Sequence, residues 1–162
     1  MNIVLEAMLF AAEVHKDQKR KFTGNPYFDH LSEVAGITAA TMPGMQVAIA
    51  VAWLHDTIED QGISGTEIGA KFGALVREGV EALTDSETGS RAERKRLSRE
   101  RLSKKPGWIQ DIKVADIISN CSSVAVHDAE FAEIYLAEKR LMLDVLQNAD
   151  PELVSFARKI VG

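Results

Sequence analysis

Apolar residues recur along the chain at intervals of three and four, and strict alternation of apolar and polar residues is rare. At the start of the chain, the apolar positions 3, 4, 7, 8, 11, 12 and 14 fall mostly on one side of a helix. Residues with high helix propensity dominate the rest. The pattern therefore predicts an all-α bundle. We predict about eight helices, over residues 2–19, 30–41, 44–58, 65–84, 91–103, 107–121, 129–147 and 151–160.

Short segments rich in glycine, proline and small polar residues separate these helices. They are "TGNPY", "MPG", "QGISG", "DSETGS" and "KKPG". Gly73 is a further point at which the helix over 65–84 can break. Asp128 and Asp150 precede helical patterns and are predicted to be N-caps. Because the connections are short and no repeat or low-complexity tract occurs, we predict a single domain over residues 1–162.

Composition fits one domain with a sizeable core, because 46% of the 162 residues are hydrophobic. The net charge is −5 and the 19 basic residues are spread along the chain, which argues against a general nucleic-acid-binding protein. Cys121 is the single cysteine, so neither an internal disulfide nor a thiolate zinc cluster can form. We expect Cys121 to be a buried residue and the protein to be cytoplasmic.

The apolar start of the chain is predicted to be a core helix and not a signal peptide. Glu6 and Glu13 interrupt it, and no basic segment precedes it. Elsewhere the chain has no uncharged apolar run of about 18 residues, so no membrane span is expected.

Four polar groups end an apolar helix in "AWLHDTIED", residues 52–60. With His55 at 0°, an uninterrupted helix places Glu59 at about 40°, Asp56 at about 100° and Asp60 at about 140°. All four then share one broad face near the helix C-terminus, where the helix dipole is already negative. A cation is needed there, supplied either by Lys and Arg side chains or by a metal ion.

Two other positions favour the metal ion. His30 lies in "PYFDH", and Asp116 lies among apolar residues in "IQDIKVADIISN", where an ionised carboxylate is costly unless it is paired or bound to metal. His30, His55, Asp56 and Asp116 make a set of two imidazoles and two carboxylates that suits Mn²⁺, Fe²⁺ or Zn²⁺, and its oxygen content favours Mn²⁺. Without convergence in space, a surface His–Asp pair remains the alternative.

These residues reproduce the H…HD…D arrangement of the HD-domain metal-dependent phosphohydrolases. More narrowly, "HKDQKRKFTGNPYFDHLSEVAGI", "WLHDTIED", "ALTDSETGSRAERKRL" and "IKVADIISN" resemble, in order, motifs of the small alarmone hydrolases and of the RelA/SpoT hydrolase domain. The resemblance runs from about residue 7 to residue 147. It implies a stand-alone hydrolase, since the chain has no room for the further regions of long RelA/SpoT enzymes.

The resemblance implies Mn²⁺-dependent removal of the 3′-pyrophosphate from guanosine tetra- or pentaphosphate, a small-molecule partner, with GDP or GTP and pyrophosphate as products. His30, His55, Asp56 and Asp116 match metal ligands. Glu59 and Asp60 match the acidic pair that positions and activates the attacking water. The matching nucleotide-binding positions are Arg20, Lys21, Asn120, Tyr135, Arg94 and Lys95.

The chain departs from the commonest family pattern at Ile117, where many relatives have a basic residue, and in "NCSSV". Two alternatives therefore stay open. The first is a phosphohydrolase acting on an adenosine alarmone, NADPH or a deoxynucleotide. The second is a non-catalytic nucleotide-binding module, which has no evident need for both water-handling acids.

Overall fold

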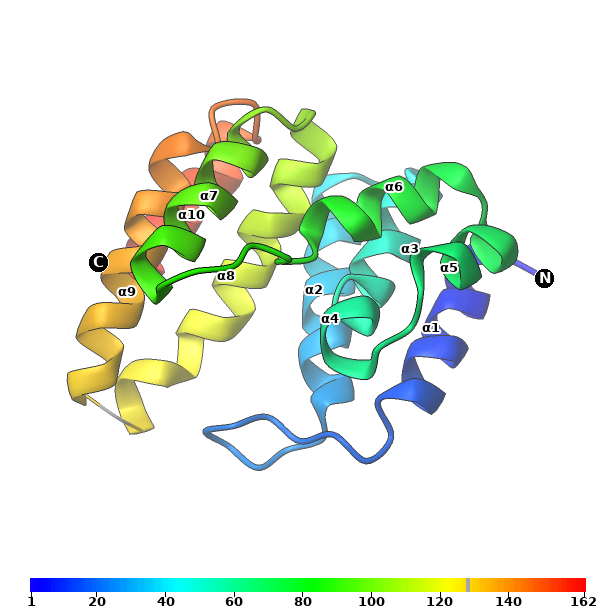
Figure 1. Cartoon of the computed structure of the whole chain (residues 1–162), viewed down its shortest axis with the longest axis horizontal. Helices are drawn as coiled ribbons and strands as arrows, with labels where there is room; N and C mark the ends of the chain where they lie inside the picture. Colours follow the sequence, from blue (N-terminus) through cyan, green and yellow to red (C-terminus); the bar gives the residue numbers. More distant parts are fainter. Residues whose placement is uncertain (128) are drawn as a thin grey trace. The chain divides into compact units, whose positions relative to one another are not determined.

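The computed structural model describes residues 1–127 and 129–162, with the backbone alone for residues 123–127. Within these residues the secondary structure consists of helices (Figure 1). The one isolated β-bridge among them joins Lys19 to Pro26. The predicted all-α class is confirmed. The ten helices are α1 (Ile3–Val14), α2 (Tyr27–Thr41), α3 (Gln46–Leu54), α4 (Thr57–Gln61), α5 (Gly65–Phe72), α6 (Ala74–Leu83), α7 (Arg91–Ser103), α8 (Gly107–His127), α9 (Ala129–Val145) and α10 (Pro151–Val161).

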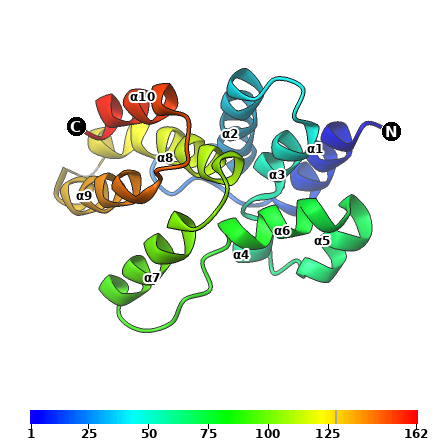
Figure 2. The ribbon, with the colours of Figure 1, turned by 90° about the horizontal axis from the view of Figure 1, so that it is seen from above.

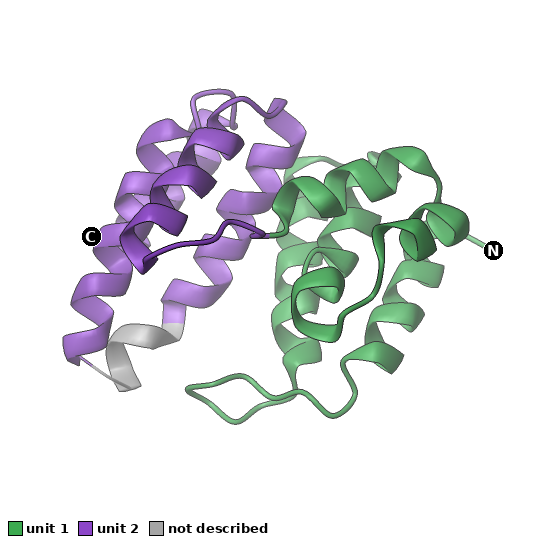
Figure 3. Cartoon of the chain, viewed as in Figure 1, with its two compact units in different colours: residues 1–84 green, residues 85–162 purple. Residues whose placement is uncertain are grey.

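The chain forms two compact units, residues 1–84 and 85–162 (Figure 3). The first unit holds α1 to α6, and the second holds α7 to α10. The single domain over residues 1–162 stays a prediction.

Helix α3 is the centre of the first unit. It packs against α1, α2 and α6, and Figure 2 shows it beside α1 and α2. Its residues Ala50 to Leu54 are all buried, because the run "VAIAVAWL" is apolar on every side. The polar groups that follow Leu54 are therefore attached to a helix end that is fixed in the core.

The predicted single helix over 44–58 is wrong, because the chain breaks between α3 and α4. Asp56 has φ −101° and ψ 1°, outside helical geometry, and the Thr57 hydroxyl donates a hydrogen bond of 2.6 Å to the Leu54 carbonyl. Gly62, with φ 66°, ends α4 as a left-handed cap. The helix predicted over 65–84 divides at Gly73, where φ is 93°. These two breaks give ten helices where about eight were predicted.

Other boundaries differ at the ends of the predicted helices. Helix α1 ends at Val14 and not at residue 19, because a turn follows in which the Gln18 amide donates to the His15 carbonyl at 3.0 Å. Helix α7 has the predicted bounds, while α8 continues to His127. The Asp150 cap is confirmed by bonds from the amides of Glu152 and Leu153, and Asp128 lies outside the described residues.

In the second unit α8 packs against α9 and α10, and α7 packs against α9. The apolar face of α8 includes Ile112 and Ile117, which are fully buried. Cys121 is also buried, as predicted. None of the described helices is long and apolar enough to cross a membrane.

Candidate metal centre

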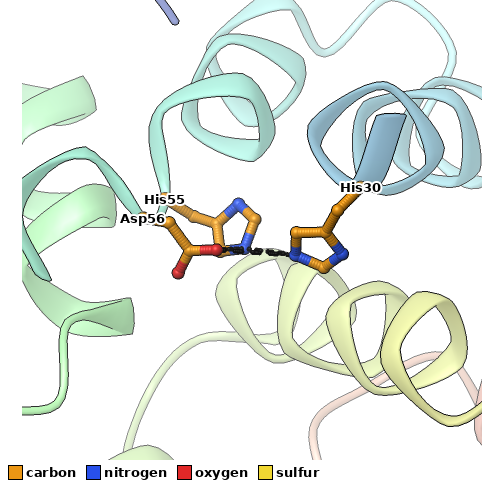
Figure 4. A group of neighbouring side chains, drawn as sticks. All are labelled: His30, His55 and Asp56. Atoms are coloured by element: carbon orange, nitrogen blue, oxygen red, sulfur yellow. Dashed lines mark hydrogen bonds and ion pairs between the residues drawn. The ribbon is translucent and has the colours of Figure 1, made fainter. Parts of the chain in front are cut away.

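Three potential ligands meet in the first unit. His30 comes from the first turn of α2, while His55 and Asp56 come from the break between α3 and α4 (Figure 4). The Nε2 atoms of the two histidines are 3.3 Å apart. Asp56 Oδ2 is 3.0 Å from His55 Nε2 and 3.5 Å from His30 Nε2. The structure thus brings together three predicted ligands from positions 25 residues apart in the chain.

The triangle formed by these atoms has the size that a shared metal ion requires. Ligand atoms about 2.1 Å from one ion lie about 3.0 Å apart in octahedral geometry and about 3.4 Å apart in tetrahedral geometry. The observed separations of 3.0, 3.3 and 3.5 Å cover both values. His30, His55 and Asp56 could therefore hold a divalent metal.

The second ring nitrogen of His55 supports the same conclusion. Its Nδ1 lies 2.8 Å from the Ala52 carbonyl oxygen, which can only accept a hydrogen bond. Nδ1 therefore carries the proton, and Nε2 presents its lone pair toward His30 and Asp56. Metal-bound histidines are typically oriented by such a bond from the other nitrogen.

Tyr27 is part of the site, although the sequence did not point to it. Its hydroxyl donates a 2.6 Å hydrogen bond to Asp56 Oδ2, and its ring lies 5.2 Å from the His30 ring. Tyr27 precedes His30 by three residues, so the two share one side of α2. That spacing is a signal in the sequence, but the partner of Tyr27 at the break between α3 and α4, Asp56, was not foreseeable.

Glu59 and Asp60 are exposed residues of α4, the short helix that follows Asp56. Gln18 Nε2 donates a 3.0 Å hydrogen bond to Asp60 Oδ2. Partial burial and the nearby charge of Asp56 raise the pKa of Asp60, while the hydrogen bond from Gln18 opposes that rise. Asp60 is thus better able to take up a proton than an ordinary surface aspartate.

Asp116 lies in the second unit, on α8, and is 7% exposed. Its Oδ2 is 2.9 Å from Lys113 Nζ, and its Oδ1 accepts a 2.8 Å hydrogen bond from Asn120 Nδ2. The burial expected for Asp116 is observed, and Asn120 lies one turn away on the same helix. The role of Asp116 as a metal ligand stays a prediction.

Two predicted nucleotide-binding residues lie in the loop between α1 and α2. Arg20 Nη1 pairs with both carboxylate oxygens of Glu33, at 3.1 and 3.2 Å. Lys21 is exposed, with its Nζ 5.4 Å from the centre of the Phe22 ring. The Lys19–Pro26 bridge closes this loop at its base.

The other predicted nucleotide-binding residues belong to the second unit. Arg94 is exposed on α7, and Lys95 Nζ lies 3.8 Å from Asp85 Oδ2. The Tyr135 ring has the Lys139 ammonium 4.7 Å from its centre, and burial raises the pKa of its hydroxyl. These positions do not test nucleotide binding, so that role also stays a prediction.

The sequence has close relatives among known proteins. A guanosine-3′,5′-bis(diphosphate) 3′-pyrophosphohydrolase MESH1 from Homo sapiens is 38% identical over 125 residues, which cover 72% of this chain and 66% of that protein. The Xenopus tropicalis MESH1 is 39% identical over 126 residues, or 73% of this chain and 67% of that protein. The GTP pyrophosphokinase rsh of Brucella melitensis biotype 1 is 35% identical over 127 residues, 75% of this chain but 17% of its own length.

The fold also matches solved structures. One, described as a metazoan ortholog of SpoT that hydrolyzes ppGpp, superposes with a TM-score of 0.91 at 26% identity, covering 99% of this chain and 94% of that one. A protein of Listeria monocytogenes EGD-e has a TM-score of 0.71 at 22% identity over 86% of this chain and 97% of its own, and shares the fold alone. A model of the HD domain matches residues 7–160. The chain therefore belongs to the HD domain family.

Proposed function

We propose that this HD-domain protein hydrolyses guanosine tetra- and pentaphosphate at the 3′-pyrophosphate, using Mn²⁺, to give GDP or GTP and pyrophosphate. The observation that carries the proposal is the triangle of His30, His55 and Asp56 ligand atoms, with sides of 3.0 to 3.5 Å. The substrate is the one that the names of the MESH1 relatives state. The chain spans about two thirds of the length of these relatives, so their whole activity is carried over as a proposal.

In this proposal His30, His55, Asp56 and Asp116 hold the metal. A bound divalent metal lowers the pKa of water and polarises a phosphoryl oxygen. Mn²⁺ is the preferred metal because the set combines imidazoles with carboxylates and has no thiolate. The Ala52 carbonyl keeps the lone pair of His55 turned inward, and the Tyr27 hydroxyl fixes the Asp56 oxygen.

Glu59 and Asp60 lie within one turn of α4 from Asp56, without belonging to the ligand triangle. We assign to them the orientation of the attacking water and the acceptance of its proton. The raised pKa of Asp60 suits the second role. Water's oxygen bonds to the phosphorus that carries the ribose 3′-oxygen, and the bond between that phosphorus and the 3′-oxygen breaks. One proton of the water goes to the 3′-oxygen, so the products are the 3′-hydroxyl and pyrophosphate.

Arg20 and Lys21 carry the positive charge that a polyphosphate needs near the loop between α1 and α2, and Arg20 already has a fixed partner in Glu33. A guanidinium binds phosphate bidentately, whereas an ammonium acts as a point charge. Asn120, Tyr135, Arg94 and Lys95 complete the proposed nucleotide-binding set. A cytoplasmic location is part of the same proposal.

The test is to incubate the purified protein with guanosine tetraphosphate, with and without Mn²⁺, and to measure GDP and pyrophosphate. Mn²⁺-dependent formation of both products supports the proposal. Inactivity toward guanosine substrates, with turnover of an adenosine alarmone, NADPH or a deoxynucleotide, overturns the substrate assignment. Inactivity toward all of them overturns the hydrolase.

A variant of Glu59 separates metal binding from water handling. Glu59→Gln removes the carboxylate charge and keeps the shape of the side chain, so metal content should stay at the wild-type level. Turnover should fall by about 10²- to 10⁴-fold, the usual contribution of general acid–base catalysis. An unchanged rate would refute the role given to Glu59.

A further inference from the structure

Gln18 occupies a junction in the first unit that the proposed mechanism does not use. Its side-chain amide bonds to Asp60, which is 42 residues away, and to Gln61. Its backbone accepts a 2.9 Å hydrogen bond from the Tyr27 amide. Gln18, a residue of the loop that follows α1, therefore joins α4 to the start of α2.

The partners of Gln18 fix the orientation of its amide. The Asp60 carboxylate is an acceptor, so the group 3.0 Å from it must be the amide nitrogen. The amide oxygen then faces two donors at 2.7 Å, His15 Nδ1 and Gln61 Nε2. Every donor in this network has an acceptor, and the reversed amide would place like groups against one another.

His15 belongs to the same hydrogen-bond network. It is 1% exposed, and its ring stacks on Tyr27 at 5.4 Å between centres and 25° between planes. Its Nδ1 bonds to the amide oxygen of Gln18, while its buried Nε2 has no hydrogen-bond partner among the described residues. The hydrogen bond with Gln18 and the stacking on Tyr27 therefore set the orientation of the ring.

Asp60 needs this external support. It is an exposed side chain on α4, which has five residues and ends at Gly62. Such a side chain would otherwise sample several rotamers. The hydrogen bond from Gln18 restrains the Asp60 carboxylate, and the Tyr27 hydroxyl is a second group that lowers its pKa.

We infer that Gln18, oriented by His15, is a positioning residue that holds the Asp60 carboxylate in the geometry required for handling water. The inference rests on the proposed function, in which Asp60 acts on the attacking water. A misplacement of about 1 Å in such a group costs on the order of 10²-fold in rate. Gln18 and His15 therefore act through Asp60, without contact with the substrate.

The first test replaces the amide by an apolar side chain. In Gln18→Leu, kcat for guanosine tetraphosphate should fall roughly 10- to 100-fold, while KM and bound metal stay as in the wild type. The melting temperature is measured alongside, and Gln18→Met repeats the test if Gln18→Leu lowers it. Asp17→Asn, a change at the exposed neighbouring residue, is the matched control and should leave kcat unaltered.

A double-mutant cycle distinguishes positioning from a general structural role. If Gln18 acts through Asp60, adding Gln18→Leu to Asp60→Asn should cause no further loss of kcat. His15→Phe keeps a ring against Tyr27 but removes the Nδ1 donor, and it should lower kcat in the same direction by a smaller factor. Additive losses for Gln18 and Asp60, or a full rate in Gln18→Leu, would overturn the inference.

A measurement independent of activity uses carboxyl NMR of the metal-free protein. Gln18→Leu removes a hydrogen bond that favours the ionised carboxylate, so the pKa of Asp60 should rise. An unchanged pKa would show that the contact does not form in solution. An inactive wild-type protein would instead overturn the proposed function, and the NMR result would still decide whether Gln18 holds Asp60.

Discussion

Asp56 and Asp116 are both buried carboxylates, 9% and 7% exposed, yet their surroundings differ. Asp116 has the Lys113 ammonium at 2.9 Å and the Asn120 amide at 2.8 Å, all on α8. Asp56 instead contacts the Tyr27 hydroxyl and the Nε2 atoms of His30 and His55, the other two members of the metal triangle. Asp116 thus has a cationic partner inside its own helix, whereas Asp56 belongs to a group of ligand atoms that could hold a divalent metal ion.

This difference separates the two acids that the resemblance places in one ligand set. The triangle at Asp56 is assembled by the first unit alone, so it should determine whether a metal binds at all. In the proposed ligand set, Asp116 would have to exchange part of its bond with Lys113 for a bond to metal. Metal binding should therefore depend more steeply on Asp56 than on Asp116.

The largest effect should come from neutralising each acid in turn. Asp56→Asn should abolish metal binding and lower turnover by on the order of 10³-fold or more, because the first unit then offers only two imidazoles to a divalent ion. Asp116→Asn should weaken metal affinity by a smaller factor. Bound metal, measured by elemental analysis after dialysis, and kcat provide the comparison. Equal losses in the two variants would remove the distinction between the acids.

Breaking the ion pair between Lys113 and Asp116 in the second unit should have the next largest effect. Lys113→Met leaves Asp116 buried without its ammonium partner, and should lower the free energy of unfolding by about 3 kcal/mol. Lys104→Met is the matched control, because Lys104 is 72% exposed in its pair with Glu100. It should cost at most about 0.5 kcal/mol. Urea unfolding of both variants gives the values, and similar costs would contradict an internal balance at Asp116.

Removing the metal should destabilise the wild type through the first unit. An ion present at about 100 times its Kd stabilises the folded protein by about 2.7 kcal/mol. A chelator should therefore lower the melting temperature by roughly 5–10 °C. The same chelator should leave Asp56→Asn unaffected. A wild-type melting temperature that does not respond to the chelator would show that Asp56 needs no external cation.

The smallest effect concerns the lysines of the second unit. Burial and the charge of Lys113 lower the pKa of Lys139 to about 8, although Asp116 acts in the opposite direction. Between pH 8 and its ordinary value of 10.5, the unfolded chain binds more protons at Lys139 than the folded chain does. Stability should rise with pH across this window. In Lys139→Met the free energy of unfolding should increase less between pH 8 and pH 10.5. Urea unfolding at a series of pH values measures this increase in both proteins.

Much of the fold could be predicted from local patterns. The bounds of α7 follow from a serine cap, a run of helix formers and the "KKPG" segment after it. The all-α class and the Asp150 cap have equally local causes. The break at Asp56 could not be predicted, because "AWLHDTIED" contains no glycine or proline to mark it.

The candidate site shows the same division. The types and order of its residues pointed to His30, His55 and Asp56, and the structure places their ligand atoms within 4.8 Å of one another. Gln18 and Tyr27 escaped notice because their contacts with α4 and Asp56 join segments far apart in the chain. Such contacts depend on tertiary packing, and no period or spacing in a single sequence encodes them.

The break between α3 and α4 limits how the His–Asp dipeptide can be used in protein engineering. Neighbouring residues of an uninterrupted helix point about 100° apart and do not face one another. Here Asp56 leaves helical geometry, and its Oδ2 lies 3.0 Å from His55 Nε2. The same two residues grafted onto a continuous helix would not form this chelating pair. A transplanted site would need the kink, the anchored apolar helix before it and the short helix after it as one module.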